Sequence, residues 1–162
     1  MTEQAGPQSC PLFVRVQEED FDAAAESARL TAGRGDIGAV VTFTGLCRDE
    51  DGRLAALELE HYPGMAESEI TRIARQAMER WPLRGLVVVH RYGLIRPGGN
   101  IVLVAAAATH RHAAFEAASF LMDFLKTDAP FWKREHPAAG AAENWVAPKA
   151  GDDESRRRWL KM

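Results

Sequence analysis

The sequence predicts an α+β domain with a largely antiparallel sheet and three main helices. Strand and helix patterns follow one another in the order β-α-β-β-α-β-β-α-β-β, which is too irregular for a doubly wound fold. No glycine-rich phosphate loop follows any of the strand patterns. The chain shows no internal repeat and no linker, and its 162 residues suffice for one domain with a sizeable core.

Alternating or β-branched side chains mark three strands in the first half of the chain. These predicted strands are residues 12–17, 37–48 and 54–62. Between the first two, the alanine-rich residues 20–32 predict a helix with Asp20 as its N-cap. The Asp-Gly turn within residues 49–53 predicts that the second and third strands form a hairpin.

Helical periodicity marks two longer helices in the second half, at residues 65–81 and 111–129. Pro130 cannot continue the second of these helices. That helix is expected to bury Ala114, Phe115, Ala118, Leu121, Met122 and Leu125. The remaining predicted strands are residues 83–93, 100–110, 131–136 and 143–146. The second of these four is almost wholly apolar, which is typical of a central strand.

We divide the chain into a flexible leader at residues 1–11, a single domain at 12–149 and a charged C-terminal tail at 150–162. The tail is expected to order only against a partner. The N-terminus lacks the features of a signal peptide, and no apolar run approaches the roughly 20 residues that span a bilayer. Cys10 and Cys47 form no disulfide framework, so a cytoplasmic protein is expected.

The most informative stretch for function runs from His110 to Glu135. His110 and Arg111 stand where a strand gives way to a helix, and Lys126 stands in the last turn of that helix. The helix separates Arg111 from Lys126 by about 22 Å, so one chain alone cannot close both ends around a small ligand. A second subunit, or strands that bend the site together, would have to complete it.

Taken singly, each of these residues has an ordinary structural explanation. The helix dipole favours Lys126 in a last turn, and a solvated strand face explains Lys133 with its charged neighbours. The aromatic pair directly before Lys133 favours a functional reading, because shielding lowers a lysine pKa toward a useful range.

Other histidines give weaker signals. His61 is explained by a strand-end turn, and His90 with Arg91 is expected to be a half-exposed couple within a strand. His110 and His112 have no further ligand at metal-binding spacing, so no metal is expected. The net charge of −3 argues against a surface built for nucleic acid.

Six motifs in order resemble those of the molybdopterin synthase catalytic subunit family. They are GAVVTFTGLCR (38–48), LELEHYPGMAE (57–67), HRYGLIRPGG (90–99), ATHRHAAFEA (108–117), LKTDAPFWKRE (125–135) and NWV (144–146). The resemblance covers roughly residues 12–149, and LKTDAPFWKRE is its most distinctive part. It implies an α/β hammerhead fold for this region, which would be the catalytic domain.

The resemblance also implies a reaction and its partners. The family converts cyclic pyranopterin monophosphate to the molybdopterin dithiolene, with no cofactor. Sulfur arrives as a thiocarboxylate on the C-terminal Gly-Gly of a small ubiquitin-like subunit. Two catalytic subunits form a homodimer at the centre of a heterotetramer.

Site residues follow from the same resemblance. Lys126 and Lys133 match the two lysines at the reacting centre. The matching substrate-binding positions are Leu46, Cys47, Arg48, His110, Arg111, Arg134, Glu135 and Lys149. Leu46 and Cys47 are expected to offer backbone contacts only. Lys149 stands where the family often places an arginine, and a lysine lacks that residue's bidentate fork.

Two alternatives belong to other functional classes. One is a non-catalytic adaptor that docks a ubiquitin-like tail, and the other is a pterin-phosphate binding module. An adaptor would not need both Lys126 and Lys133, and both are present. A binding module should lack a channel for a peptide tail.

Overall fold

A four-stranded sheet forms the centre of the molecule. The computed structural model describes residues 10–146 and 150–160. The strand order is β1 (Leu12–Gln17), β4 (Leu83–Arg91), β6 (Asn100–Ala108) and β2 (Ala39–Leu46). The β1 and β4 strands are parallel, whereas β4–β6 and β6–β2 are antiparallel. The predicted α+β class with a largely antiparallel sheet is therefore confirmed.

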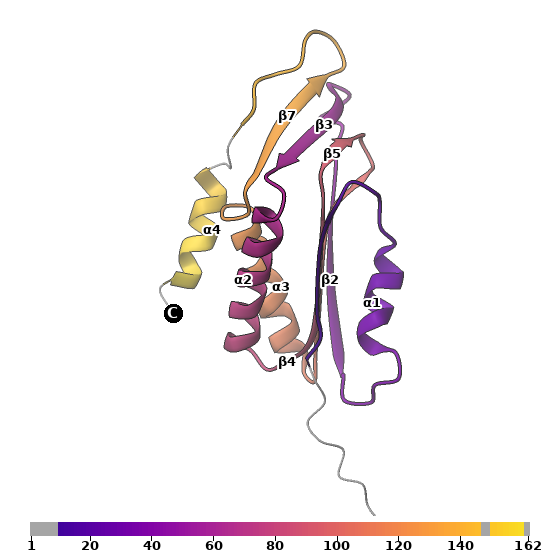
Figure 1. The fold of residues 1–162 in the computed structure, drawn as a ribbon, viewed down its shortest axis with the longest axis vertical. Helices are drawn as coiled ribbons and strands as arrows, with labels where there is room; N and C mark the ends of the chain where they lie inside the picture. The colour runs from indigo at the N-terminus through magenta and orange to yellow at the C-terminus, as the bar shows by residue number, and fades with distance from the viewer. Residues whose placement is uncertain (1–9, 147–149, 161–162) are drawn as a thin grey trace, which may run out of the picture.

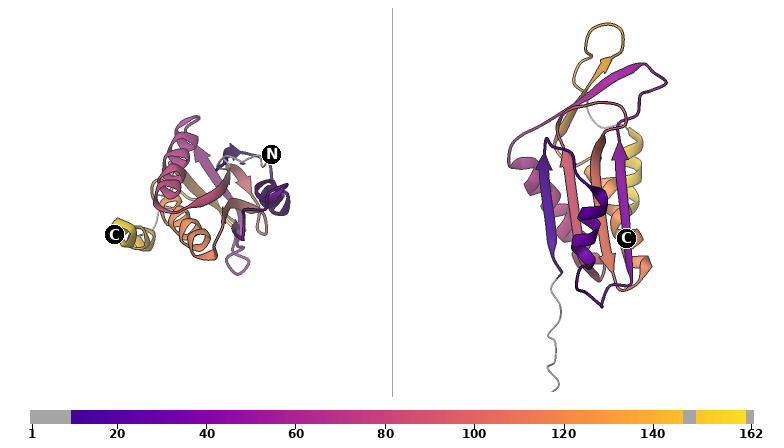
Figure 2. Two further views of the ribbon diagram at one scale, coloured as in Figure 1. Left: turned by 90° about the horizontal axis from the view of Figure 1, so that it is seen from below. Right: turned by 90° about the vertical axis from the view of Figure 1, so that its right-hand side faces the viewer.

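Helices cover both faces of this sheet (Figure 1). The short helix α1 (Ala23–Thr31) lies on one face, and α2 (Met65–Arg80) and α3 (Arg111–Leu125) lie on the other. Figure 2 shows α1 in front of the sheet when the molecule is turned by 90°. Because helices cover both faces, the central β6 strand is buried from Leu103 to Ala108, as its apolar run predicts.

A second, three-stranded sheet lies at one end of the molecule (Figure 1). Its order is β5 (Gly93–Ile95), β3 (Leu54–His61) and β7 (Phe131–Pro137). The predicted hairpin of β2 with β3 is wrong, because β2 pairs with β6 while β3 pairs with β5 and β7. The intervening turn has positive φ at Glu50, Asp51 and Gly52. It carries the chain from one sheet to the other.

Two helices differ in detail from the predictions. Asp22, not Asp20, caps α1 by accepting a hydrogen bond from the Ala25 amide. Asp20 instead accepts hydrogen bonds from the Phe21 amide and the Asn100 side chain. Helix α3 ends at Leu125, four residues before the predicted end, and continues as turns up to the proline.

The buried face of α3 is wider than predicted. Phe115 is 60% exposed, although we expected it in the core, and Met122 is only partly buried. Phe120 and Phe124 are buried instead. These two rings pack on each other with centroids 4.5 Å apart. Phe120 also contacts Trp81 at the end of α2, so α3 is covered by a neighbouring helix as well as by the sheet.

The C-terminal tail contains a helix, α4 (Ala150–Leu160), that packs against its own chain. Trp159 is 4% exposed, and its Nε1 donates a 2.6 Å hydrogen bond to Asp123 on α3. Arg80 of α2 donates to the Trp159 carbonyl. These contacts order α4 without a partner, contrary to our expectation. The division into leader, domain and tail stays a prediction, and residues 1–9 of the leader lie outside the described residues.

Within the described part of the chain, every helix is too short or too polar to cross a membrane.

Candidate functional site

A cavity of about 560 Å³ opens where the two sheets meet the C-terminal end of α3. Most of its wall is apolar and comes from β2, β3, β6 and α3. Lys126 and Lys133 both line it, so the structure brings together the two predicted catalytic residues. Two ammonium groups in an apolar-walled cavity favour an anionic ligand, because a low-dielectric wall screens their charge less than bulk water does.

A change from helix to strand positions the two lysines. Lys126 is the C-cap of α3, and its amide donates to the Met122 carbonyl at 3.2 Å. Lys133 lies in β7, opposite Leu59 of β3. Between them, Pro130 ends the helical turns and the chain enters the second sheet. Only six residues, 127–132, therefore separate the two lysines that line this cavity.

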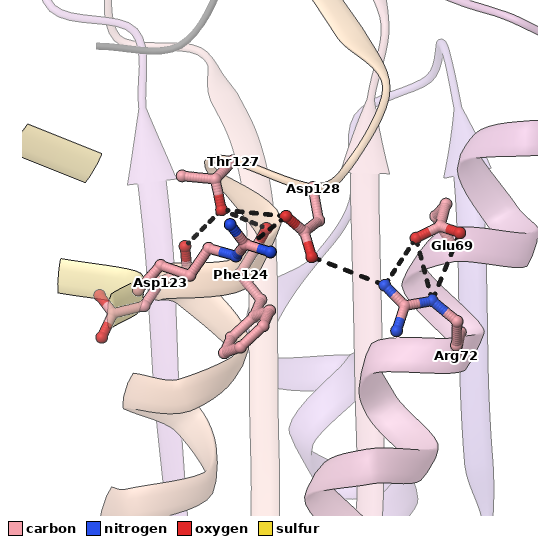
Figure 3. A network of polar contacts seen from close by, with 7 residues as sticks. Glu69, Arg72, Asp123, Phe124, Thr127 and Asp128 are labelled. Atoms are coloured by element: carbon pink, nitrogen blue, oxygen red, sulfur yellow. Dashed lines mark hydrogen bonds and ion pairs between the residues drawn. The ribbon is translucent and has the colours of Figure 1, made fainter. Parts of the chain in front are cut away.

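A polar network anchors the segment between the lysines (Figure 3). Asp128 pairs with Arg72 of α2 at 3.5 Å and with Arg156 of α4 at 3.1 Å. Arg72 is held in turn by Glu69 at 2.9 Å. The Thr127 hydroxyl donates to carbonyl groups in the last turn of α3. Two other helices thus fix the turn that follows Lys126.

Three predicted residues lie at the end of β2 and just after it, and only the first of them lines the cavity. Leu46 lines it and is half exposed. Cys47 is buried, and its backbone N–H and C=O both bond to the Gly98–Gly99 turn. Burial raises the pKa of its thiol. The Arg48 side chain is 79% exposed and pairs with Glu50 at 3.0 Å. Ligand contacts by these three residues stay predictions.

His110 and Arg111 lie at the other end of α3. His110 is the N-cap of the helix but makes no side-chain capping bond, and both residues are exposed. Strand register separates them from Arg48, because Ala39 pairs with Ala108 while Leu46 pairs with Asn100. One chain therefore does not bring Arg48 and the His110–Arg111 pair into one pocket.

The residues after Lys133 divide between the two faces of β7. Arg134 points away from the lysine face, pairs with Glu58 at 2.7 Å and stacks on Trp145 at 4.4 Å. His136 also bonds to Glu58, and together these bonds lower the pKa of that carboxyl. The carbonyl of Glu135 accepts a bond from the Glu143 amide. Lys149 lies outside the described residues.

His90 is a residue of the cavity that the sequence analysis missed. We expected it to be half exposed beside Arg91, but its side chain is 9% exposed and lines the cavity. Its ring stacks on Phe131 with centroids 3.9 Å apart. Burial lowers its pKa to about 4. Strand alternation could have predicted this burial, because Leu86 and Val88 lie on the same face of β4 as His90 and both are buried in the core.

No group of histidine, cysteine or acidic side chains suited to a metal occurs among the described residues. The titratable side chains that line the cavity are two lysines and one imidazole. An α+β domain with two lysines and an imidazole in one cavity has the side chains needed to hold an anionic ligand and to move protons.

Comparison with known proteins assigns the family. Residues 16–128 match the family model described as "MoaE protein". The molybdopterin synthase catalytic subunit of Brucella melitensis is 69% identical over 154 residues, which cover 95% of this chain and 94% of the relative. The chain therefore belongs to the MoaE family, as its motifs predicted.

Solved structures agree with this assignment. The molybdopterin biosynthesis MoaE protein of Burkholderia ambifaria superposes with a TM-score of 0.79 and 45% identity, covering 92% of this chain and 98% of that one. A chain from the complex of subunits 1 and 2 of the Helicobacter pylori molybdopterin-converting factor shares the fold, with a TM-score of 0.65 and 19% identity. The match to the Helicobacter chain covers 86% of this chain and 90% of that one.

Proposed function

We propose that this chain is the catalytic subunit of a molybdopterin synthase. It transfers sulfur from the C-terminal thiocarboxylate of a small ubiquitin-like subunit to cyclic pyranopterin monophosphate, forming the dithiolene. Family membership and a relative of the same name at 69% identity support the activity. The structural observation that carries the proposal is the convergence of Lys126 and Lys133 on one cavity.

The chemistry of the two lysines fits this reaction. The thiocarboxylate sulfur forms a bond to a carbon of the pterin side chain as that carbon's bond to oxygen breaks, and water then cleaves the acyl–sulfur bond. A second thiocarboxylate repeats the step, because a dithiolene holds two sulfurs. The small subunit leaves with an ordinary carboxylate. Both reactants carry negative charge, which two ammonium groups offset in a low-dielectric wall. One lysine also moves protons as the substrate oxygen leaves, so no catalytic cysteine is needed.

A homodimer would complete the site. Arg111 and Lys126 lie at opposite ends of α3, about 22 Å apart by helix geometry. A second chain that presents His110 and Arg111 to the cavity would bind the phosphate there, together with Arg48. Arg134, Glu135 and Lys149 are further proposed substrate contacts. The exposed ring of Phe115 lies in the first turns of α3 and offers apolar area for such an interface.

The small subunit is proposed to bind at the distal ends of this dimer, giving a heterotetramer. The two-subunit complex of the Helicobacter pylori factor, whose chain has the same fold, supports a small partner. We place the reaction in the cytoplasm, because Cys10 and Cys47 are both free.

Reconstitution tests the proposal directly. The purified chain is mixed with cyclic pyranopterin monophosphate and the thiocarboxylated small subunit, and the dithiolene product is quantified. The matched control uses the same small subunit with an ordinary C-terminal carboxylate, which has no sulfur to give. Absence of product with verified components would reject the enzymatic function. Tail binding without turnover would favour the adaptor.

A further inference from the structure

His90 is a polar side chain of the cavity to which the proposed reaction assigns no task. It comes from β4 of the main sheet, whereas Lys126 and Lys133 come from α3 and β7. Its neighbours in the wall are mainly apolar, among them Ile101 and Val102. A buried polar group in such surroundings normally has hydrogen-bond partners for its polar atoms.

The protonation state of His90 follows from one hydrogen bond. Nδ1 lies 2.8 Å from the Arg91 carbonyl oxygen. A carbonyl oxygen only accepts, so Nδ1 carries the proton and donates it. The buried ring is neutral, with its pKa lowered to about 4 by desolvation, so Nε2 keeps a lone pair and can only accept.

Nε2 has no partner among the residues that the structure describes. The one hydrogen bond of this ring is made by Nδ1. Nε2 is not one of the fully buried side-chain atoms that lack a partner, so it is open to the surface. An acceptor on the wall of a ligand-sized cavity is satisfied when a donor of the ligand or a water reaches it.

The ring is held in a fixed orientation. Phe131 stacks on it at 3.9 Å with 15° between the planes. Phe131 is in turn contacted by the edge of His61 at 6.0 Å, and His61 packs on Tyr92 at 4.3 Å. A rotamer locked by packing pre-organises a hydrogen bond, since little entropy is lost when the ligand arrives.

From these observations we infer that His90 is a ligand-contacting residue whose Nε2 accepts a hydrogen bond from an N–H donor of the molecule bound between Lys126 and Lys133. The inference deepens the proposed function and rests on it for the identity of the ligands. Two sources provide such a donor: the pterin ring system and the backbone of the small subunit's tail. The lysines recognise negative charge, whereas His90 recognises a neutral donor.

Two substitutions separate the acceptor from the ring. His90→Phe keeps an aromatic ring on Phe131 but removes Nε2, and His90→Gln places an amide oxygen near the position of Nε2. His136→Phe is the matched control, because His136 bonds to Glu58 and does not line the cavity. Thermal unfolding and near-ultraviolet circular dichroism check that each variant folds.

Binding is measured by calorimetry for the pterin alone and for the small subunit alone. We expect His90→Phe to raise one of the two dissociation constants about three- to tenfold, as loss of one hydrogen bond does. His90→Gln should recover part of this loss, and His136→Phe should stay within twofold. If the donor is in the tail, deleting the terminal Gly-Gly abolishes the difference between wild type and His90→Phe.

Two outcomes would overturn the inference. In one, a folded His90→Phe variant binds both ligands within twofold of wild type. In the other, His90→Gln binds as weakly as His90→Phe, so the acceptor is irrelevant. If His90→Phe does not fold, His90→Leu, which also lacks an acceptor, takes its place under the same two criteria. Failure of wild-type turnover concerns the proposed function, whereas these binding constants concern His90 alone.

Discussion

His90 and Phe131 stack face to face, with ring centroids 3.9 Å apart and planes inclined by 15°. The first residue belongs to β4 of the main sheet and the second begins β7 of the small sheet. Their contact therefore joins the two sheets at the wall of the cavity. Phe131 lies two residues before Lys133, so this stacking helps to fix the strand that carries that lysine.

Substitution of either lysine should reduce activity and leave the fold intact. Lys126→Ala is expected to reduce turnover nearly to background, and Lys133→Ala should reduce it strongly, because loss of a positioned acid–base group costs about 10²–10⁴ in rate. Single-turnover formation of the dithiolene measures both effects. Circular dichroism and the unfolding midpoint should remain close to wild type. Near-normal turnover of a folded Lys126→Ala chain would remove Lys126 from the chemistry.

Burial of a neutral His90 predicts a pH dependence of stability. An unfolded histidine titrates near pH 6.5, whereas the folded pKa is about 4, so the unfolded state binds more protons between these values. The contribution of neutral His90 to the free energy of unfolding is therefore complete above about pH 6.5. It should fall by about 3 kcal/mol as the pH drops to 4.

Urea unfolding from pH 7 to pH 4 measures this loss, with His90→Phe and His112→Gln compared with wild type. His90→Phe removes the titrating group, so its stability should depend less steeply on pH. His112 is exposed, so its variant should follow wild type. Equal slopes for wild type and His90→Phe would show that His90 is not buried in its neutral form.

Much of the site could be predicted, because the sequence confines its chemistry to short stretches. Lys126 and Lys133 flank Pro130, and a helix followed by a strand returns both to one cavity. The hairpin of β2 with β3 was wrong because an Asp-Gly turn reports only local conformation. The partner of β2 is instead the long apolar strand β6, which pairs with it along its whole length.

Long-range packing explains the other differences. Phe115 and Phe120 both suit a helix that is apolar on more than one side, so periodicity did not determine which ring is buried. The packing of α4 and the end of α2 on Phe120 decides it. The buried state of His90 likewise depends on Phe131, which lies 41 positions later in the chain.

Helix α4 should contribute measurably to stability. Trp159 contacts Trp81 and Phe120 and donates to Asp123, so Trp159→Ala should lower the free energy of unfolding by about 3 kcal/mol. Trp159→Phe keeps most of the apolar contact and should cost about 1 kcal/mol for the lost hydrogen bond. Chemical denaturation with fluorescence of the other tryptophans reports both values. An unchanged midpoint for Trp159→Ala would mean that α4 is undocked in solution.

The last prediction concerns sites shared between two chains. Arg111 and Lys126 stand at opposite ends of α3, so a ligand in the cavity can meet both kinds of residue only if a second chain supplies Arg111. Lys126→Ala and Arg111→Ala homodimers should each be nearly inactive. After subunit exchange, one composite site of each mixed dimer contains both wild-type residues, whereas the other lacks both. A mixed dimer should therefore regain about half the activity of a wild-type dimer. Differently tagged chains, purified in tandem, allow the mixed species to be assayed alone. If verified mixed dimers stay inactive, each chain must carry its own complete site, and the two ends of α3 must serve different ligands.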